Sequence, residues 1–253
     1  MSPVKVAVIT GVAQGIGRAT AIELDRRGWA LVLLDLQRID SSVYRDALAL
    51  AGDLTDASFL AGAHRDALSR FGEVTALVNN AGRSMIAPAT ETSADAVRAV
   101  LEVNLVAPFV LSTLFGASML SRGRGAIVNV ASVAGLQGVA ERSAYNASKH
   151  GLVGLTRTLA VEWGAKGVRV NAVAPGWVKT EMDHADQAGG SYDDRDIVEH
   201  VPMGRFARPD DVASAVAWLC DDDQSGFVNG VVLPVDGGWT ADGSWQTLRL
   251  RQR

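Results

Sequence analysis

Short apolar runs alternate with longer segments of helical periodicity along most of the chain. Mostly apolar runs predict buried strands at 4–9, 29–34, 47–51, 74–78, 126–130, 168–172 and 231–235. Apolar spacing and capping residues predict helices at 16–27, 56–71, 93–120, 143–163 and 209–220. Pro108 is expected to kink the third helix, since it removes a backbone hydrogen bond. The polar segment 36–46 is too short for a full crossover helix, and 183–196 is predicted to be a mobile loop.

This alternation predicts an α/β fold with a doubly wound parallel sheet covered by helices on both faces. Its crossovers are expected to be right-handed. No repeat or low-complexity linker divides the sequence, so residues 1–253 are expected to form one domain. Ligands of such sheets bind outside the carboxyl ends of the strands. The sequence places Gly11, Asp35, Asp53, Asn80, Ser132 and Pro175 at those ends.

Three glycines separate the first strand from the first helix. Gly11, Gly15 and Gly17 carry no Cβ, so the backbone can approach a ligand closely, and the helix begins with unpaired N–H groups. This arrangement suits an anion, most naturally a pyrophosphate. Many turns from strand to helix contain glycines for steric reasons only, so the glycines alone leave both interpretations open.

Asp35 makes the dinucleotide interpretation more specific. It ends the second apolar run about 18 residues after Gly17, close to the spacing at which a carboxylate binds the ribose hydroxyls of NAD. Its charge would repel a 2′-phosphate, and Gln14 in the turn adds no positive charge. NAD is therefore favoured over NADP, although Arg38 lies close to Asp35 in the sequence.

Composition narrows the class of protein. The chain of 253 residues has a net charge of −4 and no internal basic block, which argues against nucleic acid and anionic membranes as partners. Cys220 is the sole cysteine, and the four histidines show no metal-ligand spacing. No signal peptide is recognised, and the apolar stretch 103–120 is shorter than a comfortable membrane span, so a soluble cytoplasmic protein is expected.

Tyr145 and Lys149 form the main catalytic hypothesis. They are four residues apart on a predicted helix, so both lie on one face. A nearby ammonium favours the phenolate, and lowering the phenol pKa from about 10 to near 7 needs roughly 4 kcal/mol. Ser132 ends the preceding strand at the same sheet edge as Gly11. The three side chains could therefore supply general acid/base chemistry.

The whole chain resembles the short-chain dehydrogenases/reductases. The matching motifs are T-G-x-x-x-G-x-G at 10–17, Asp35, Asp53-Leu54, N-N-A-G at 79–82, Asn104, Ser132, Y-x-x-x-K at 145–149 and P-G-x-x-x-T at 175–180. Their joint order is more specific than any one motif. The resemblance implies a seven-stranded Rossmann-type fold in a homotetramer or homodimer, with the Asn104 and Tyr145 helices at the main subunit contact.

The resemblance also implies a role for each matched residue. Tyr145 would exchange a proton with the substrate oxygen, which Ser132 would hydrogen-bond. Lys149 would bind the nicotinamide ribose and lower the Tyr145 pKa, while Asn104 would hold a proton-relay water. The cofactor-binding set is Gly11, Gln14, Gly15, Ile16, Gly17, Asp35, Leu36, Asp53, Leu54, Asn80, Ala81, Gly82, Tyr145, Lys149, Pro175, Gly176, Val178 and Thr180.

Substrate contacts are expected in a loop at about 176–205 and in nearby segments. The candidates are Ser132, Arg83, Gln137, Arg142, Trp177, Met182 and His184, each of which ordinary loop packing would also explain. Two inward arginines would suit a polar or anionic substrate such as a polyol, sugar or hydroxy acid. The tail at 239–253, with Trp239 and Trp245, is expected to lie along a neighbouring subunit.

Three functions follow from these patterns. The leading hypothesis is an NAD-dependent oxidoreductase that interconverts a secondary alcohol and its ketone. The alternatives are an NADPH-dependent 3-oxoacyl-thioester reductase, against which Asp35 argues, and a nucleotide-binding sensor without turnover. The sensor would be expected to lack Ser132, Tyr145 or Lys149, and all three are present.

Overall fold

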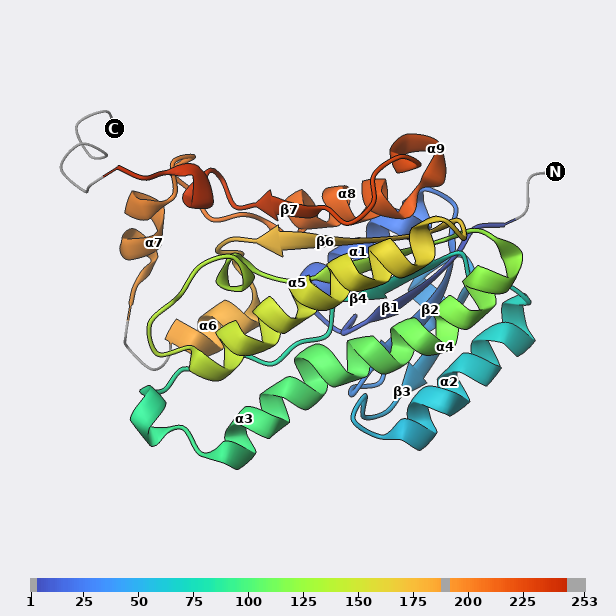
Figure 1. Cartoon of the computed structure of the whole chain (residues 1–253), viewed down its shortest axis with the longest axis horizontal. Helices are drawn as coiled ribbons and strands as arrows, with labels where there is room; N and C mark the ends of the chain where they lie inside the picture. The colour runs from blue at the N-terminus through green and yellow to red at the C-terminus, as the bar shows by residue number, and fades with distance from the viewer. Residues whose placement is uncertain (1–3, 188–191, 245–253) are drawn as a thin grey trace.

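A computed structural model describes residues 4–187 and 192–244 and contains one seven-stranded parallel sheet (Figure 1). In chain order the strands are β1 (Val6–Thr10), β2 (Ala30–Asp35), β3 (Ala47–Ala51), β4 (Ala76–Asn79), β5 (Gly125–Val130), β6 (Val168–Pro175) and β7 (Val232–Val235). Their order across the sheet is β3-β2-β1-β4-β5-β6-β7. The reversal between β1 and β4 is the switch point at which such sheets bind ligands.

Helices cover both faces of the sheet (Figure 1). They are α1 (Gly15–Arg26), α2 (Ala57–Phe71), α3 (Ala94–Leu101), α4 (Ala107–Arg122), α5 (Ser143–Gly164), α6 (Glu181–Gln187), α7 (Asp194–His200), α8 (Pro209–Cys220) and α9 (Asp222–Ser225). One apolar core joins the sheet to α2, α4 and α5, and a second joins it to α1 and α8. The doubly wound α/β prediction is confirmed.

The strands form where the sequence is apolar on both faces. Every residue of β1, β2, β4, β5 and β6 is buried, as expected for parallel strands covered on both sides. The predicted strand bounds are confirmed to within three residues, and β3 and α8 agree with the prediction at both ends. Asp56 accepts the Ser58 N–H at 2.8 Å and thereby caps α2, also as predicted.

Two predictions about local structure are wrong. The helix predicted at 93–120 is interrupted not by a proline kink but by a π-helical turn at Glu102–Val106. Pro108 lies in the first turn of α4, directly after this π-helical turn, and the helical stretch continues through it from Ala94 to Arg122. The segment predicted as a loop at 183–196 contains α6 and the start of α7, while 188–191 lie outside the described residues.

In the described part of the chain, one helical stretch is apolar and long enough to cross a membrane. It spans Ala94–Arg122, and 44% of its most apolar window is buried inside the structure. Its α4 part packs Leu111, Phe115 and Met119 into the core against the sheet. A core helix of this kind meets the same length and composition criteria.

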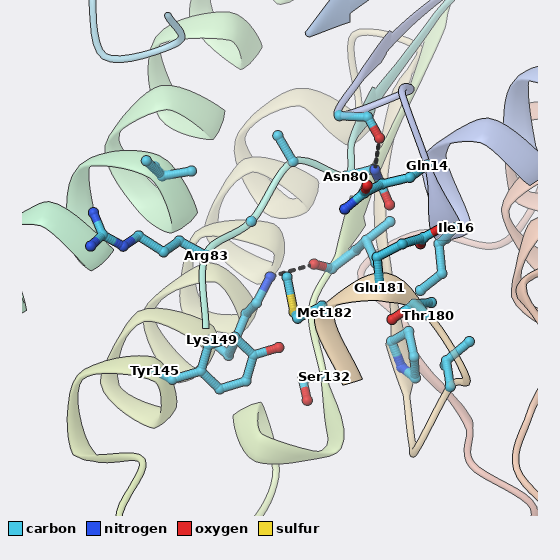
Figure 2. Close-up of a pocket in the computed structure, with 18 of the residues that line it drawn as sticks. Gln14, Ile16, Asn80, Arg83, Ser132, Tyr145, Lys149, Thr180, Glu181 and Met182 are labelled. Carbon is cyan, nitrogen blue, oxygen red and sulfur yellow. Dashed lines mark hydrogen bonds between the residues drawn. The ribbon is translucent and has the colours of Figure 1, made fainter. Parts of the chain in front are cut away.

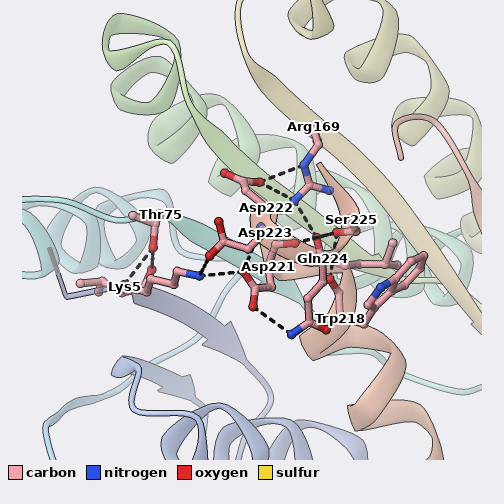
Figure 3. A network of polar contacts seen from close by, with 11 residues as sticks. Lys5, Thr75, Arg169, Trp218, Asp221, Asp222, Asp223, Gln224 and Ser225 are labelled. Carbon is pink, nitrogen blue, oxygen red and sulfur yellow. Dashed lines mark hydrogen bonds and ion pairs between the residues drawn. The ribbon is translucent and has the colours of Figure 1, made fainter. Parts of the chain in front are cut away.

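Ion pairs join segments at the amino ends of β1 and β6, the end opposite the glycine turn (Figure 3). The Lys5 ammonium contacts the carboxylate of Asp221 at 2.7 Å, and Arg169 contacts Asp222 at 2.6 Å. Beside them, burial raises the pKa of the Cys220 thiol to about 12. This thiol therefore stays protonated and unreactive, and the network connects β1 and β6 to the end of α8.

Candidate active site

A cavity of about 740 Å³ lies at the carboxyl ends of the strands. Predicted site residues that line it are Gly11, Gln14, Gly15, Ile16, Asp35, Leu36, Asp53, Leu54, Asn80, Ala81, Gly82, Arg83, Ser132, Arg142, Tyr145, Lys149, Pro175, Gly176, Trp177, Val178, Thr180 and Met182. Gly17 and Asn104 support its wall from behind, whereas Gln137 is exposed outside it. His184 lines a separate shallow groove beside α1.

The glycine turn between β1 and α1 has the conformation that its sequence predicts. Gly11 has a φ of +70°, and a Cβ on Gly17 would lie 2.0 Å from the Gly11 carbonyl oxygen, so neither position accepts a larger side chain without displacement. Gln14 precedes α1 and makes no capping hydrogen bond with its side chain. The first N–H groups of α1 therefore remain available to an anion.

Asn80 connects the glycine turn to the neighbouring strand. Its side-chain amide donates to the carbonyls of Thr10 at 2.8 Å and Gly11 at 2.9 Å. The Thr10 hydroxyl in turn accepts the N–H groups of Asn80 and Ala81 at 3.0 and 2.9 Å. The N-N-A-G segment thus fixes the turn in position, a role that sequence reasoning did not assign to it.

Asp35 ends β2 at the rim of the cavity. Its carboxylate accepts the N–H of Ala13 at 2.9 Å and the N–H of Gln37 at 2.9 Å, which fixes its orientation. The residue is only 8% exposed. Asp53, by contrast, is exposed and accepts the backbone N–H and the hydroxyl of Thr55, each at 2.8 Å, so it stabilises a turn after β3.

Ser132, Tyr145 and Lys149 meet in the same cavity (Figure 2). Ser132 follows β5 and accepts the Ala134 N–H at 3.1 Å. The buried Lys149 ammonium donates to the Val130 carbonyl at 2.8 Å and lies 5.7 Å from the centroid of the Tyr145 ring. The three chemistry-bearing groups thus come from one strand end and one helix face, as the sequence predicts.

Burial has the largest effect on the pKa values of Tyr145 and Lys149. It raises the pKa of Tyr145, an effect that the Ser132 hydrogen bond and the Arg142 charge oppose and the Asp186 charge reinforces. Burial also lowers the pKa of Lys149 to about 8. The lowering of the Tyr145 pKa by Lys149 stays a prediction.

Asn104 lies in the π-helical turn, fully buried. Its side-chain oxygen accepts the Arg83 N–H at 2.8 Å, and its amide donates to the Arg83 carbonyl and to the Ser148 hydroxyl, both at 3.0 Å. Because these contacts occupy the side chain, Asn104 holds the loop after β4 against α5.

A buried ion pair lies at the substrate end of the cavity. Arg142 donates to the Asp186 carboxylate and to the Ser84 hydroxyl, both at 2.9 Å. Sequence reasoning missed Asp186, Ser84 and Tyr192, because nothing in the polar segment indicates which acid pairs with Arg142. Arg83 is exposed, and its side chain extends away from Lys149 (Figure 2).

Three aromatic side chains, those of Trp177, Tyr192 and Trp239, pack together behind this ion pair. Trp177 packs edge-on against Tyr192 at a centroid distance of 5.1 Å and lies 5.8 Å from Trp239. Trp239 therefore packs against the pocket wall, and the contact of the tail with a neighbouring subunit stays a prediction. Trp245 and the rest of the tail, 245–253, lie outside the described residues.

Comparisons with known proteins agree with this geometry. A family model described as enoyl-(acyl carrier protein) reductase matches residues 11–240. The chain is 42% identical to cis-4-hydroxycyclohexanecarboxylate dehydrogenase of Sinomonas cyclohexanicum, over 94% of this chain and 97% of that protein. It is 37% identical to D-threitol dehydrogenase of Mycolicibacterium smegmatis, over 93% of each chain. The chain belongs to the short-chain dehydrogenase/reductase family.

Solved structures of the family extend the comparison to the fold. A Beutenbergia cavernae protein, proposed to be an NAD(P)-dependent gluconate 5-dehydrogenase, is 41% identical with a TM-score of 0.87, and the match covers 94% of this chain and 97% of that one. That structure holds NADP at low occupancy, and another similar structure holds NADH. This member of the short-chain dehydrogenase/reductase family is thus a nicotinamide-dependent oxidoreductase that acts on CH–OH groups and the corresponding carbonyls.

Proposed function

We propose that the protein is an NAD-dependent dehydrogenase that interconverts a small secondary alcohol, such as a polyol, and its ketone. The supporting observation is that Ser132, Tyr145 and Lys149 lie in the same cavity as the glycine turn and Asp35. A cavity of about 740 Å³ is of the size that cofactor sites have. Two relatives are named for a tetritol and for a hydroxylated ring carboxylate, and both names support a secondary alcohol as the substrate.

The catalytic proposal assigns proton transfer to Tyr145. The Tyr145 phenolate, which the Lys149 ammonium and the nicotinamide cation of bound NAD would stabilise, would accept the proton of the substrate hydroxyl during oxidation, and Ser132 would hydrogen-bond the same oxygen. Lys149 binds the hydroxyls of the nicotinamide ribose. NAD, when bound, supplies the ring that accepts the hydride from the carbinol carbon. The Asn104 side chain fixes the loop after β4 against α5, and Asn104 is proposed to hold the water that carries protons to solvent.

The cofactor proposal depends mainly on Asp35. Its fixed, buried carboxylate can accept both hydroxyls of the adenosine ribose and would repel a phosphate at the same place. The N–H groups at the start of α1 bind the pyrophosphate. Further contacts are proposed for the adenine (Asp53, Leu54), the adenosine side (Asn80, Ala81, Gly82) and the carboxamide (Pro175, Val178, Thr180).

Assembly into a homodimer or homotetramer is part of the proposal. The outward faces of α4 and α5 expose Phe109 at 48% and Val161 at 84%, which supports a subunit contact through these helices. A soluble, cytoplasmic enzyme that does not bind nucleic acid or membranes remains our proposal from the net charge of −4.

The test is a matrix of cofactors and substrates. The purified protein is mixed with NAD or NADP and with threitol, 2,3-butanediol, cyclohexanol or gluconate, and cofactor reduction is followed at 340 nm. We expect NAD reduction with the neutral alcohols and at least a tenfold lower kcat/KM with NADP. Oxidation of NADPH by a 3-oxoacyl thioester, with no alcohol turned over, would instead establish the reductase alternative. Cofactor binding without any turnover would establish the sensor.

A further inference from the structure

The Arg142–Asp186 ion pair lies at the substrate end of the cavity, beside the catalytic residues. Arg142 and Asp186 are 44 residues apart and come from different elements, the residue before α5 and the helix α6. Ser84, from the loop after β4, donates to the same Asp186 oxygen at 3.0 Å and accepts from Arg142. Three segments therefore converge on one pair of charges, and all three side chains are largely buried.

The backbone fixes the Arg142 end of this pair. The preceding residue, Glu141, has a φ of +60°, a left-handed conformation that is unfavourable for a residue with a side chain. Its carbonyl accepts the Ala87 N–H at 2.8 Å, and Ala87 forms a bridge with Arg142. The guanidinium also lies 5.6 Å from the Trp177 ring centroid and 6.0 Å from that of Tyr145. Arg142 is thus held close to the catalytic phenol.

At the substrate end of the cavity, the charge of Arg142 is compensated within the pair. Asp186 neutralises Arg142, and the Lys149 ammonium is bonded to the Val130 carbonyl. Asp183, another acid in the cavity wall, contacts Lys179 at 3.2 Å and the Tyr192 hydroxyl at 3.2 Å. Trp177 and Met182 add apolar surface. A carboxylate that approaches Arg142 would meet the negative charges of Asp186 and Asp183, and Arg142 is already paired with Asp186.

A substrate hydroxyl, in contrast, matches this end of the cavity. The guanidinium has N–H donors beyond those used by Asp186 and Ser84, and Asp186 Oδ1 is not used by the Arg142 and Ser84 bonds, which both go to Oδ2. A hydroxyl can accept from the first and donate to the second, whereas a carboxylate can only accept.

From this, and resting on the proposed function, we infer that the Arg142–Asp186 pair is the specificity determinant of the site: it selects neutral alcohols that carry a second hydroxyl and rejects hydroxy acids. The inference narrows the expectation of a polar or anionic substrate, such as a polyol, sugar or hydroxy acid, to the neutral members of that set. Of the two relatives named above, one is named for a neutral tetritol and the other for a carboxylate, so both charge classes of substrate occur among similar proteins.

The experiment compares substrates matched in size but not in charge. We would measure kcat/KM with NAD for 2,3-butanediol against 3-hydroxybutanoate, and for 1,2-cyclohexanediol against cis-4-hydroxycyclohexanecarboxylate. The wild-type enzyme is expected to prefer the neutral member of each pair by at least tenfold. Asp186→Asn keeps the side-chain shape and removes its charge, so the ratio should shift toward the carboxylates by at least tenfold. The double variant Arg142→Gln/Asp186→Asn should lose that shift.

Glu199→Gln is the matched control, because it also removes the acid of an ion pair, that with Arg195 on α7, but lies outside the cavity. It should leave the ratio unchanged. Equal or better turnover of the carboxylates by the wild-type enzyme would overturn the inference, whether or not the variants fold. So would an unchanged ratio in a folded, NAD-binding Asp186→Asn. A wild-type enzyme that oxidises no alcohol at all would instead overturn the proposed function.

Discussion

Burial of a charged Lys149 should destabilise the fold, and replacing it should therefore raise stability while abolishing activity. Lys149 is 3% exposed, and burial lowers its pKa from 10.5 to about 8. A difference of that size corresponds to about 3 kcal/mol. Lys149→Met removes this cost and also the hydrogen bond to Val130, which contributes about 1 kcal/mol. The net expectation is a variant more stable by about 2 kcal/mol below pH 8.

The pH dependence gives this prediction its sign. Below pH 8 the folded and unfolded chains both carry the ammonium, so the wild-type protein bears the full cost of burying it. Between pH 8 and 10.5 the folded chain has released the proton and the unfolded chain still holds it, so the wild-type free energy of unfolding rises with pH. The advantage of Lys149→Met should therefore shrink to near zero by about pH 9.5.

The assay is urea unfolding of both proteins at pH 6.5 and pH 9.5, without cofactor and at equal protein concentration. The difference in the free energy of unfolding between the two proteins cancels the contributions of other groups that titrate in this range. Lys166→Met, at an exposed lysine, is the control and should show no pH-dependent difference. A difference between Lys149→Met and wild type that is the same at both pH values would refute the claim that a buried ammonium destabilises the fold.

Three further predictions follow from contacts described above. Gly17→Ala should abolish NAD binding measured by calorimetry, because the new Cβ would lie 2.0 Å from the Gly11 carbonyl oxygen. The control is Gly62→Ala on α2, whose Cβ would meet no atom closer than 3.8 Å. It should add about 0.5–1 kcal/mol to the free energy of unfolding. Asp35→Asn should lower the ratio of kcat/KM for NAD to that for NADP by about tenfold or more, because the charge that repels a 2′-phosphate is gone; an unchanged ratio would count against the role of Asp35. Asp186→Asn should move the acidic limb of the pH–rate profile for alcohol oxidation to lower pH, because Tyr145 must be deprotonated to act and the Asp186 charge raises its pKa; a shift to higher pH would contradict this.

The elements that the sequence predicted well are those whose formation depends on local patterns. β3 and α8 lie where their apolar runs, and the proline in the first turn of α8, indicated. Proximity of Tyr145 and Lys149 follows from their spacing on one helix. Ser132 was predicted to join them because parallel strands end at one sheet edge.

The features that escaped prediction depend on contacts between distant segments. The Arg142–Asp186 pair joins residues 44 positions apart in a segment without periodicity, so no pattern could identify it. The π-helical turn at Glu102–Val106 adds one residue to a helical turn, for which apolar spacing provides no sign. The raised pKa of Tyr145 reflects the extent of its burial, which depends on packing from several elements.

The most direct test of the account is the replacement of the Tyr145 hydroxyl. Tyr145→Phe removes the proton acceptor and keeps the ring, so kcat for oxidation of 2,3-butanediol with NAD should fall by about 10²–10⁴-fold. NAD affinity, measured by calorimetry, should change by only a few-fold, because the glycine turn and Asp35 are untouched. Oxidation by Tyr145→Phe at a rate within tenfold of the wild-type rate would contradict the central claim that Tyr145 transfers the proton.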